Sequence, residues 1–146
     1  MGHIGMQPQQ VMHYGGFPVI GKDRVAVEKL WEDAKAVQDA GVFALVIESV
    51  PAAVAKALTA RLRIPTIGIG AGSGCSGQVL VTQDLLGFFT EFKPKFVKRY
   101  AELAGTALRG IDSFVKDVRN GDFPDEEHSY ALGDESLLKS LDEIFS

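Results

Sequence analysis

A single carboxylate follows an apolar run in the stretch ALVIESVP, residues 44–51. Residues 43–47 are all apolar and are predicted to form a strand buried on both faces, as in a parallel sheet. Functional groups of such folds gather at the carboxyl ends of strands, where Glu48 stands. Apolar surroundings raise the pKa of a carboxyl group and suit it to act as a general base near neutral pH. Position alone leaves a second interpretation. In it, Glu48 has no catalytic role and is simply stabilised near the N-terminus of the next helix, where the helix dipole favours a negative charge.

A glycine-rich loop, GIGAGSGCSGQ at 68–78, follows another predicted strand. Residues 72–77 match G-x-G-x-x-G, but a dinucleotide site requires a helix to begin there, and the β-like run 78–81 follows instead. No Lys-Ser/Thr pair follows the loop, so it is not a P-loop either. We expect that Gly70 and Gly72 let the backbone approach a substrate closely, or that they only form a tight turn.

His3 lies in GHIG, between glycines at an apparent strand end. It is a candidate to donate a hydrogen bond to a substrate carboxylate, the alternative being a structural or exposed histidine. His13 and His128 have no metal-ligand spacing, and zinc motifs are absent from the sequence. Cys75 has no base near it in the sequence, so we expect it to fill space rather than to act as a nucleophile.

Aromatic and charged clusters occupy the second half of the chain. We expect the phenylalanine pairs to be core and the basic residues to form one face of a helix, with no nucleic-acid motif around them. The acidic run 125–127 is expected to be solvated. The aromatic and basic residues concerned are Phe88, Phe89, Phe92, Phe96, Lys93, Lys95, Lys98 and Arg99.

Strands and helices are predicted to alternate along the first part of the chain, which favours a parallel sheet. A helix should run from an N-cap at Asp23 to Gly41, and a later one should begin at Asp134. Further elements are expected at 51–62 (helix), 65–69 (strand), 78–81 (strand) and 94–119 (one helix, or two broken near Gly105 or Gly110). Three full strands are too few for a closed barrel, so the chain is a small open α/β domain or the later part of something larger.

Composition limits the classes of function. The 146 residues carry a net charge of −4, which gives no nucleic-acid footprint. The single cysteine excludes an intrachain disulfide and suggests a reducing compartment. No apolar run approaches the roughly 20 residues that span a membrane, and we see no signal-peptide pattern at the N-terminus.

Six blocks in order resemble one enzyme family: GHIGMQPQ, AGVFALVIESVP, IPTIGIGAG, CSGQVLVTQDLLGF, PKFVKRYA and FPDEEHSY. Together they closely resemble the ketopantoate hydroxymethyltransferases, from residue 2 to about residue 130. The resemblance implies a (βα)8 barrel of the phosphoenolpyruvate/pyruvate type. This chain would hold its C-terminal part, from the end of strand 5 to strand 8 plus C-terminal helices. Residues 1–130 would belong to the barrel, and 131–146 would form an acidic extension with one amphipathic helix.

The resemblance also implies a reaction. A hydroxymethyl group passes from 5,10-methylenetetrahydrofolate to 2-oxoisovalerate (3-methyl-2-oxobutanoate), giving ketopantoate for pantothenate and coenzyme A. Glu48 aligns with the general base of the family, and His3 with a histidine close to the bound keto acid. Mg2+ chelated by the keto acid would stabilise the enolate. The metal-binding acids of the family lie in the first half, which has no counterpart here, so we expect no metal ligand in this chain and little activity from it alone.

Two rival interpretations stay open. In one, the chain is a non-catalytic half-barrel that self-associates or complements a partner, because half a barrel leaves an exposed sheet edge. A related keto-acid lyase with the same metal-enolate chemistry is the other. The expected partners are a keto acid and a folate, without nucleic acid or membrane, in a homo-oligomer. The expected location is cytoplasmic. The alternative is mitochondrial, because CSGQ, with Ser76, resembles the motif of the plant and fungal branch.

Overall fold

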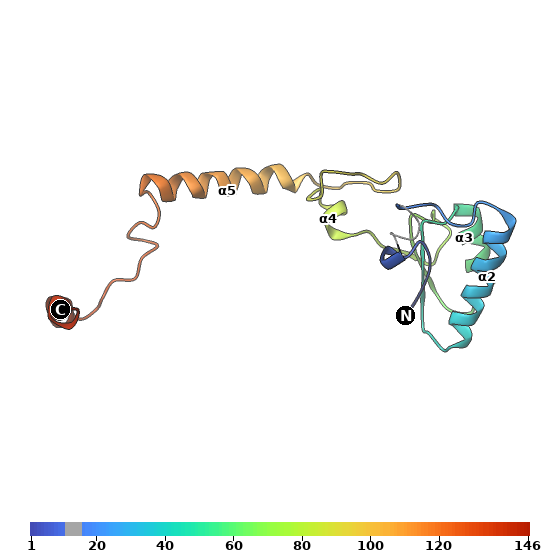
Figure 1. Cartoon of the computed structure of the whole chain (residues 1–146), viewed down its shortest axis with the longest axis horizontal. Helices are drawn as coiled ribbons and strands as arrows, with labels where there is room; N and C mark the ends of the chain where they lie inside the picture. The colour runs from blue at the N-terminus through green and yellow to red at the C-terminus, as the bar shows by residue number, and fades with distance from the viewer. Residues whose placement is uncertain (11–15) are drawn as a thin grey trace. The chain divides into compact units, whose positions relative to one another are not determined.

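A computed structural model describes residues 1–10 and 16–146 of the chain (Figure 1). Its internal contacts divide it into two compact units, Met1–Glu102 and Leu103–Ser146. The first unit holds the sheet and the candidate site, and the second unit is helical. Each unit is described by itself.

The first unit is built on a four-stranded parallel sheet whose strands follow one another in chain order. The strands are β1 (Gly2–Gly5), β2 (Leu45–Glu48), β3 (Thr66–Ile69) and β4 (Gly77–Gln78). Gly5 pairs with Glu48, and Glu48 pairs with Ile69, so three strands end at the same level. Parallel strands with helices between them are the arrangement expected of part of a (βα)8 barrel.

Helix α2 (Arg24–Asp39) begins and ends where its sequence predicts. The Asp23 carboxylate accepts a hydrogen bond from the Ala26 backbone N–H at 2.9 Å, which satisfies one of the free N–H groups at the helix start. Gly41, just beyond the helix, has φ of +86°, a left-handed conformation that glycine adopts without strain. Both ends of α2 confirm the prediction.

The core lies between the sheet and two helices that contact each other on one of its faces, α2 and α3 (Ala52–Thr59) (Figure 1). Leu30 and Ala34 of α2 and Leu58 of α3 are buried against Leu45 and Ile47 of β2. The strand is two residues shorter at its start than predicted. Phe43 lies before β2 and is exposed, so the buried apolar run is shorter than the sequence suggests.

The segment between β4 and the second unit differs most from expectation. The predicted strand at 78–81 is reduced to the two residues of β4, and the short helix α4 (Thr82–Leu85) follows. Residues 94–102 are not helical. They are tied to the sheet unit instead, since Val97 is buried and the Tyr100 backbone N–H donates to the Leu85 carbonyl at 2.8 Å.

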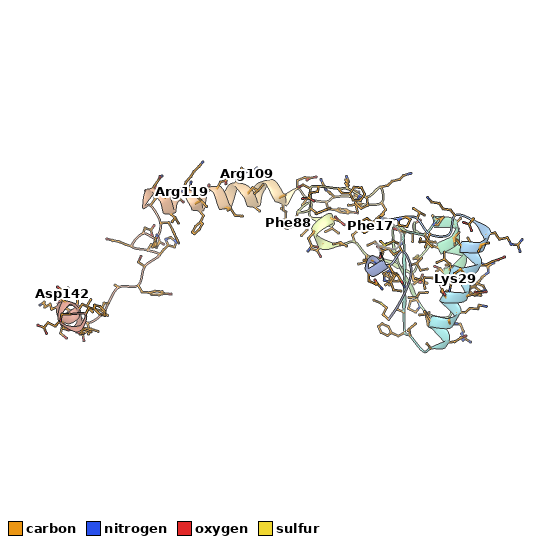
Figure 2. All side chains as sticks on the ribbon, viewed as in Figure 1. Phe17, Lys29, Phe88, Arg109, Arg119 and Asp142 are labelled. Carbon is orange, nitrogen blue, oxygen red and sulfur yellow. The ribbon has the colours of Figure 1, made fainter. Side chains whose placement is uncertain are left out.

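The second unit contains two helices, α5 (Leu103–Asn120) and α6 (Glu135–Ile144), joined by an irregular segment. Helix α5 is a single helix that continues through Gly105 and Gly110. Figure 2 shows its side chains, Arg109 and Arg119 among them, projecting from the helix. Asp134 caps α6 by accepting from the backbone N–H groups of Ser136 and Leu137, as predicted. No helix in the described part of the chain is long and apolar enough to cross a bilayer.

Candidate functional site

Glu48 is held at the carboxyl end of β2 by backbone hydrogen bonds on both sides. Its carbonyl accepts from the Met6 backbone N–H at 2.9 Å, and the next residue, Ser49, donates to the Ile69 carbonyl at 2.9 Å. Gly5 has φ of +90°, and a Cβ there would collide with the Glu48 carbonyl oxygen. The glycine therefore allows the close approach that positions Glu48 beside β1.

Ser49 adds a local constraint to the same position. It is buried and has φ of +51°, the only non-glycine residue with positive φ in the described ranges 1–10 and 16–146. Its carbonyl accepts from the Ile20 backbone N–H at 2.8 Å. Left-handed backbone at a non-glycine residue is strained and concentrates at functional sites, where the surrounding structure enforces it.

The Glu48 side chain is mostly buried, with 12% of its surface exposed, beside the partly exposed His3. His3 Nε2 lies 3.1 Å from Glu48 Oε2, within ion-pair distance but without the alignment of a hydrogen bond. Burial raises the pKa of the Glu48 carboxyl group, and the neighbouring His3 opposes this rise. A raised pKa suits a carboxylate that must accept a proton near neutral pH.

A cavity of about 960 Å³ opens in front of Glu48. Its described lining comes from the segment after β1, the segment before α2, the ends of β2 and β3 and the segment after β4, and it is mostly apolar. The lining residues are Met6, Pro8, Phe17, Val19, Glu48, Ser49, Ile69, Val81, Gln83, Asp84, Phe88, Phe89, Phe92, Pro94, Lys95 and Phe96. A largely apolar pocket with a few polar groups and a perturbed carboxyl group is the usual form of a ligand site.

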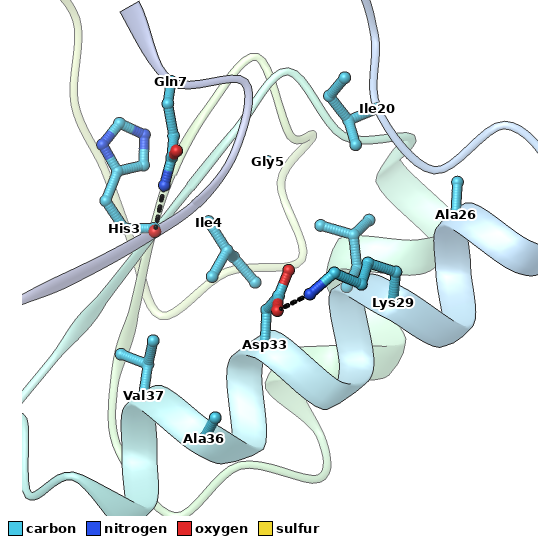
Figure 3. A pocket seen from close by; sticks show the side chains of 11 residues that line it. His3, Ile4, Gly5, Gln7, Ile20, Ala26, Lys29, Asp33, Ala36 and Val37 are labelled. Atoms are coloured by element: carbon cyan, nitrogen blue, oxygen red, sulfur yellow. Dashed lines mark hydrogen bonds and ion pairs between the residues drawn. The ribbon is translucent and has the colours of Figure 1, made fainter. Parts of the chain in front are cut away.

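His3 also lines a second cavity, of about 510 Å³, between β1 and α2 (Figure 3). Gln7 donates to the His3 carbonyl there at 3.3 Å, and Lys29 pairs with Asp33 along α2. The structure thus brings His3 and Glu48 together, although the two side chains border different cavities. The contact of His3 with a substrate stays a prediction.

Gly70 and Gly72 both have positive φ, +62° and +73°. A Cβ on Gly70 would meet the Phe96 ring at 2.7 Å, and one on Gly72 would collide with Ala52. Neither glycine is among the residues that line the two cavities, and both take part in a turn with close packing. Their predicted backbone contact with substrate stays a prediction.

The expectation that the phenylalanines are core is wrong. Phe88, Phe89, Phe92 and Phe96 are each more than a third exposed, and all four line the cavity in front of Glu48. The basic residues 93–99 do not form a helix face either, because their segment is irregular. Pro94 disfavours helical conformation only in the residue before it, so the sequence carried no clear signal for either result.

No three His, Cys, Asp or Glu side chains come together as a metal site within residues 1–10 and 16–146. Glu48 has only His3 as an ionisable neighbour within ion-pair distance in that part of the chain. The described residues therefore do not fit a Mg2+ site by themselves.

The fold and the site define a parallel α/β domain that carries a mostly buried carboxyl group at the carboxyl edge of its sheet. The family model of ketopantoate hydroxymethyltransferase matches residues 1–126, and the chain belongs to this family. The keto-acid lyase interpretation is thereby set aside.

Relatives support the same assignment. The chain is 52% identical over 145 residues to 3-methyl-2-oxobutanoate hydroxymethyltransferase of Nitratidesulfovibrio vulgaris (strain DP4), covering 97% of this chain and 47% of that protein. It is 49% identical over 141 residues to the enzyme of the same name from Clostridium novyi, covering 97% and 51%. The chain thus spans about half the length of the curated relatives it matches.

Proposed function

We propose that this chain is the carboxyl-terminal part of an enzyme that hydroxymethylates 2-oxoisovalerate to ketopantoate. The observation that carries the proposal is Glu48, whose carboxyl group is mostly buried at the carboxyl end of β2 and faces a cavity. The family supports the reaction class, and the geometry supports the role of one residue in it.

In the proposed step Glu48 removes a proton from C3 of the keto acid, the carbon beside the keto group. The C–H bond breaks, the proton passes to the Glu48 carboxylate, and the electron pair forms the C2–C3 double bond of an enolate. C3 then bonds to the methylene carbon of 5,10-methylenetetrahydrofolate, the donor that the family resemblance implies. Both C–N bonds of that carbon break, water supplies the oxygen of the new hydroxyl group, and tetrahydrofolate leaves with both nitrogens protonated. Burial raises the pKa of the Glu48 carboxyl group, which favours proton transfer to the carboxylate.

The chain alone is proposed to lack turnover. Mg2+ is the Lewis acid implied for this family, and such an ion supplies several kcal/mol of charge stabilisation when bound. The described residues do not form its site. We therefore assign the metal site to the half of the family fold that the chain does not match.

Proton exchange tests the role of Glu48. Proton NMR in D2O would follow loss of the C3 proton of 2-oxoisovalerate, with the chain alone and mixed with the first half of the Clostridium novyi relative. We expect Mg2+-dependent exchange only from the mixture. Glu48→Gln should abolish it, and Glu32→Gln, an exposed carboxylate on α2, should leave it unchanged. Exchange at the unchanged rate in Glu48→Gln would reject Glu48 as the base.

A second candidate function is that of a non-catalytic half-barrel that associates with a further copy or a complementary chain. It is favoured by the sheet order, which leaves β1 and β4 as the outer strands of the described sheet. Light scattering after size-exclusion chromatography separates the two. A concentration-independent monomer with no exchange in any mixture would contradict both functions.

A further inference from the structure

Ser49 lies where the chain turns from β2 into α3, between two residues whose conformations are already restricted. Glu48 is extended because it pairs with both neighbouring strands. Val50 precedes Pro51, which disfavours helical conformation in the residue before it, and a β-branched side chain tolerates positive φ poorly. The left-handed turn, with φ of +51°, therefore falls on Ser49.

The equivalent turns at the neighbouring strands are made by glycine. Gly5, the last residue of β1, has φ of +90°, and Gly70, the residue after β3, has φ of +62°. Glycine adopts such angles without strain, whereas a residue with a Cβ adopts them at a cost in stability. Of the three strands that end at the same level, only β2, which carries Glu48, turns on a residue with a side chain.

The turn also places two consecutive residues on one cavity. Neighbouring residues of an extended strand present their side chains to opposite faces, yet Glu48 and Ser49 both line the cavity of about 960 Å³. Ser49 is itself buried. The departure from strand geometry at Ser49 therefore forms part of the wall beside the Glu48 carboxyl group.

Backbone hydrogen bonds fix the peptide groups on either side of Ser49. Its N–H donates to the Ile69 carbonyl at 2.9 Å, and its carbonyl accepts from the Ile20 N–H at 2.8 Å. The Glu48 carbonyl accepts from the Met6 N–H at 2.9 Å. The Cβ of Ser49 removes much of the φ and ψ freedom that glycine would leave at this point. Three segments and one Cβ thus hold the backbone from which the Glu48 side chain projects.

We propose that Ser49 is a positioning residue, whose strained backbone holds the Glu48 carboxyl group toward the cavity in the pose that removes the C3 proton. The inference rests on the proposed function, in which Glu48 is the base. Strain at a non-glycine residue lowers stability and persists where the surrounding structure enforces a functional geometry. A reacting group misplaced by about 1 Å can lose on the order of 100-fold in rate, so a well-held carboxylate outweighs the strain.

Two other roles of Ser49 lead to different results. If the left-handed turn serves folding alone, glycine can replace serine without harm to the site, because glycine makes the same turn. If the hydroxyl group itself binds the substrate, alanine and glycine are equally deficient at this position. Both are outcomes of the test below.

Proton exchange at C3, in the mixture with the first half of the Clostridium novyi relative, tests the proposal with three variants. Ser49→Gly frees the backbone and should slow exchange about tenfold, although its melting temperature is unchanged or higher. Ser49→Ala keeps the Cβ and should regain most of the rate. Ser73→Gly is the matched control. Ser73 is exposed, lies in the glycine-rich loop and lines neither cavity, so this variant should exchange at the unaltered rate.

The pKa of Glu48 in the chain alone gives a second measurement that needs no turnover. Burial raises this pKa, so a carboxyl group that can swing toward solvent should titrate closer to its ordinary value. Carbon NMR should show this change in Ser49→Gly and not in Ser49→Ala. The other charged groups around Glu48 are the same in all variants, namely His3 at 3.1 Å and Asp84 and Lys95 on the cavity.

Exchange at the unaltered rate in Ser49→Gly would refute the positioning role alone and leave the proposed function intact. A loss of exchange in Ser49→Gly that comes with a lower melting temperature, or an equal loss in Ser49→Ala, would also overturn the proposal. If the mixture with the unaltered chain shows no exchange, the proposed function fails. The Glu48 pKa of the two variants then decides the role of Ser49 by itself.

Discussion

His3 Nε2 and Glu48 Oε2 lie 3.1 Å apart, although their residues are on different strands and 45 positions apart in the sequence. The register of β1 and β2 places His3 opposite Val46 and Gly5 opposite Glu48. Because both side chains are near the carboxyl edge, one imidazole and one carboxyl group share a small, partly buried space. The pKa of Glu48 is therefore linked to the neighbouring imidazole.

His3→Gln should raise the pKa of Glu48 further. Burial already raises it, and the substitution removes the neighbour that opposes the rise. Carbon NMR of the chain labelled at the glutamate carboxyl carbon would follow the titration directly. His128→Gln is the control, because His128 pairs with the exposed Asp125 in the second unit. A Glu48 pKa that falls or does not move would contradict the linkage.

Glu48→Gln should change the free energy of unfolding in a pH-dependent way. The folded chain holds the Glu48 proton to higher pH than the unfolded chain, so this residue loses stabilisation as pH rises from about 4.3 through its raised folded pKa. The variant should have the same free energy of unfolding as the unaltered chain near pH 4 and a larger one at pH 7. Urea denaturation at both pH values measures this, and a variant less stable at pH 7 would show that the sign is wrong.

Substitutions of Ser49 should separate backbone strain from side-chain size. Ser49→Gly relieves the left-handed conformation and should be neutral or stabilising by up to about 1 kcal/mol. Ser49→Val places a β-branched residue at positive φ and should destabilise by about 2 kcal/mol or more. Thermal unfolding followed by circular dichroism tests the order of the two. Equal melting temperatures would mean that the strain is absent.

Thr66→Val should weaken the junction of β3 and the glycine-rich loop. Thr66 is fully buried, its hydroxyl lies 2.8 Å from that of Thr59, and it accepts from the Ser76 backbone N–H at 3.2 Å. Removing the hydroxyl deprives the half-buried Thr59 hydroxyl and the Ser76 backbone N–H of this partner and should cost about 1–2 kcal/mol. The exposed Thr106→Val on α5 is the comparison, with an expected cost under about 0.5 kcal/mol in denaturant titrations. Similar losses in both would argue against the hydroxyl cluster.

The sequence predicted those features that depend on local chemistry. The caps at Asp23 and Asp134 were predictable because their carboxylates bond to N–H groups two or three residues away. The placement of Glu48 at a strand end followed from the apolar run before it. These signals lie within a few residues of the structure they specify.

Features that depend on distant contacts were missed. Apolar residues usually favour burial, so the sequence predicted Phe92 and Phe96 to be core. The structure instead leaves both partly exposed in a cavity that Phe17, distant in the sequence, also lines. The 3.1 Å approach of His3 to Glu48 likewise depends on strand register, which one sequence without an alignment does not specify. The length of β4, two residues, likewise depends on its pairing with β3.

The common level at which β1, β2 and β3 end makes the site sensitive to spacing as well as to residue type. One residue inserted between Gly41 and Leu45 would advance the strand by about 3.3 Å, and the pleat would turn every side chain to the opposite face. The glutamate would remain in the chain, yet the carboxyl group would no longer face the cavity. Variation in the length of this connection is thus expected to be less tolerated than substitution within it.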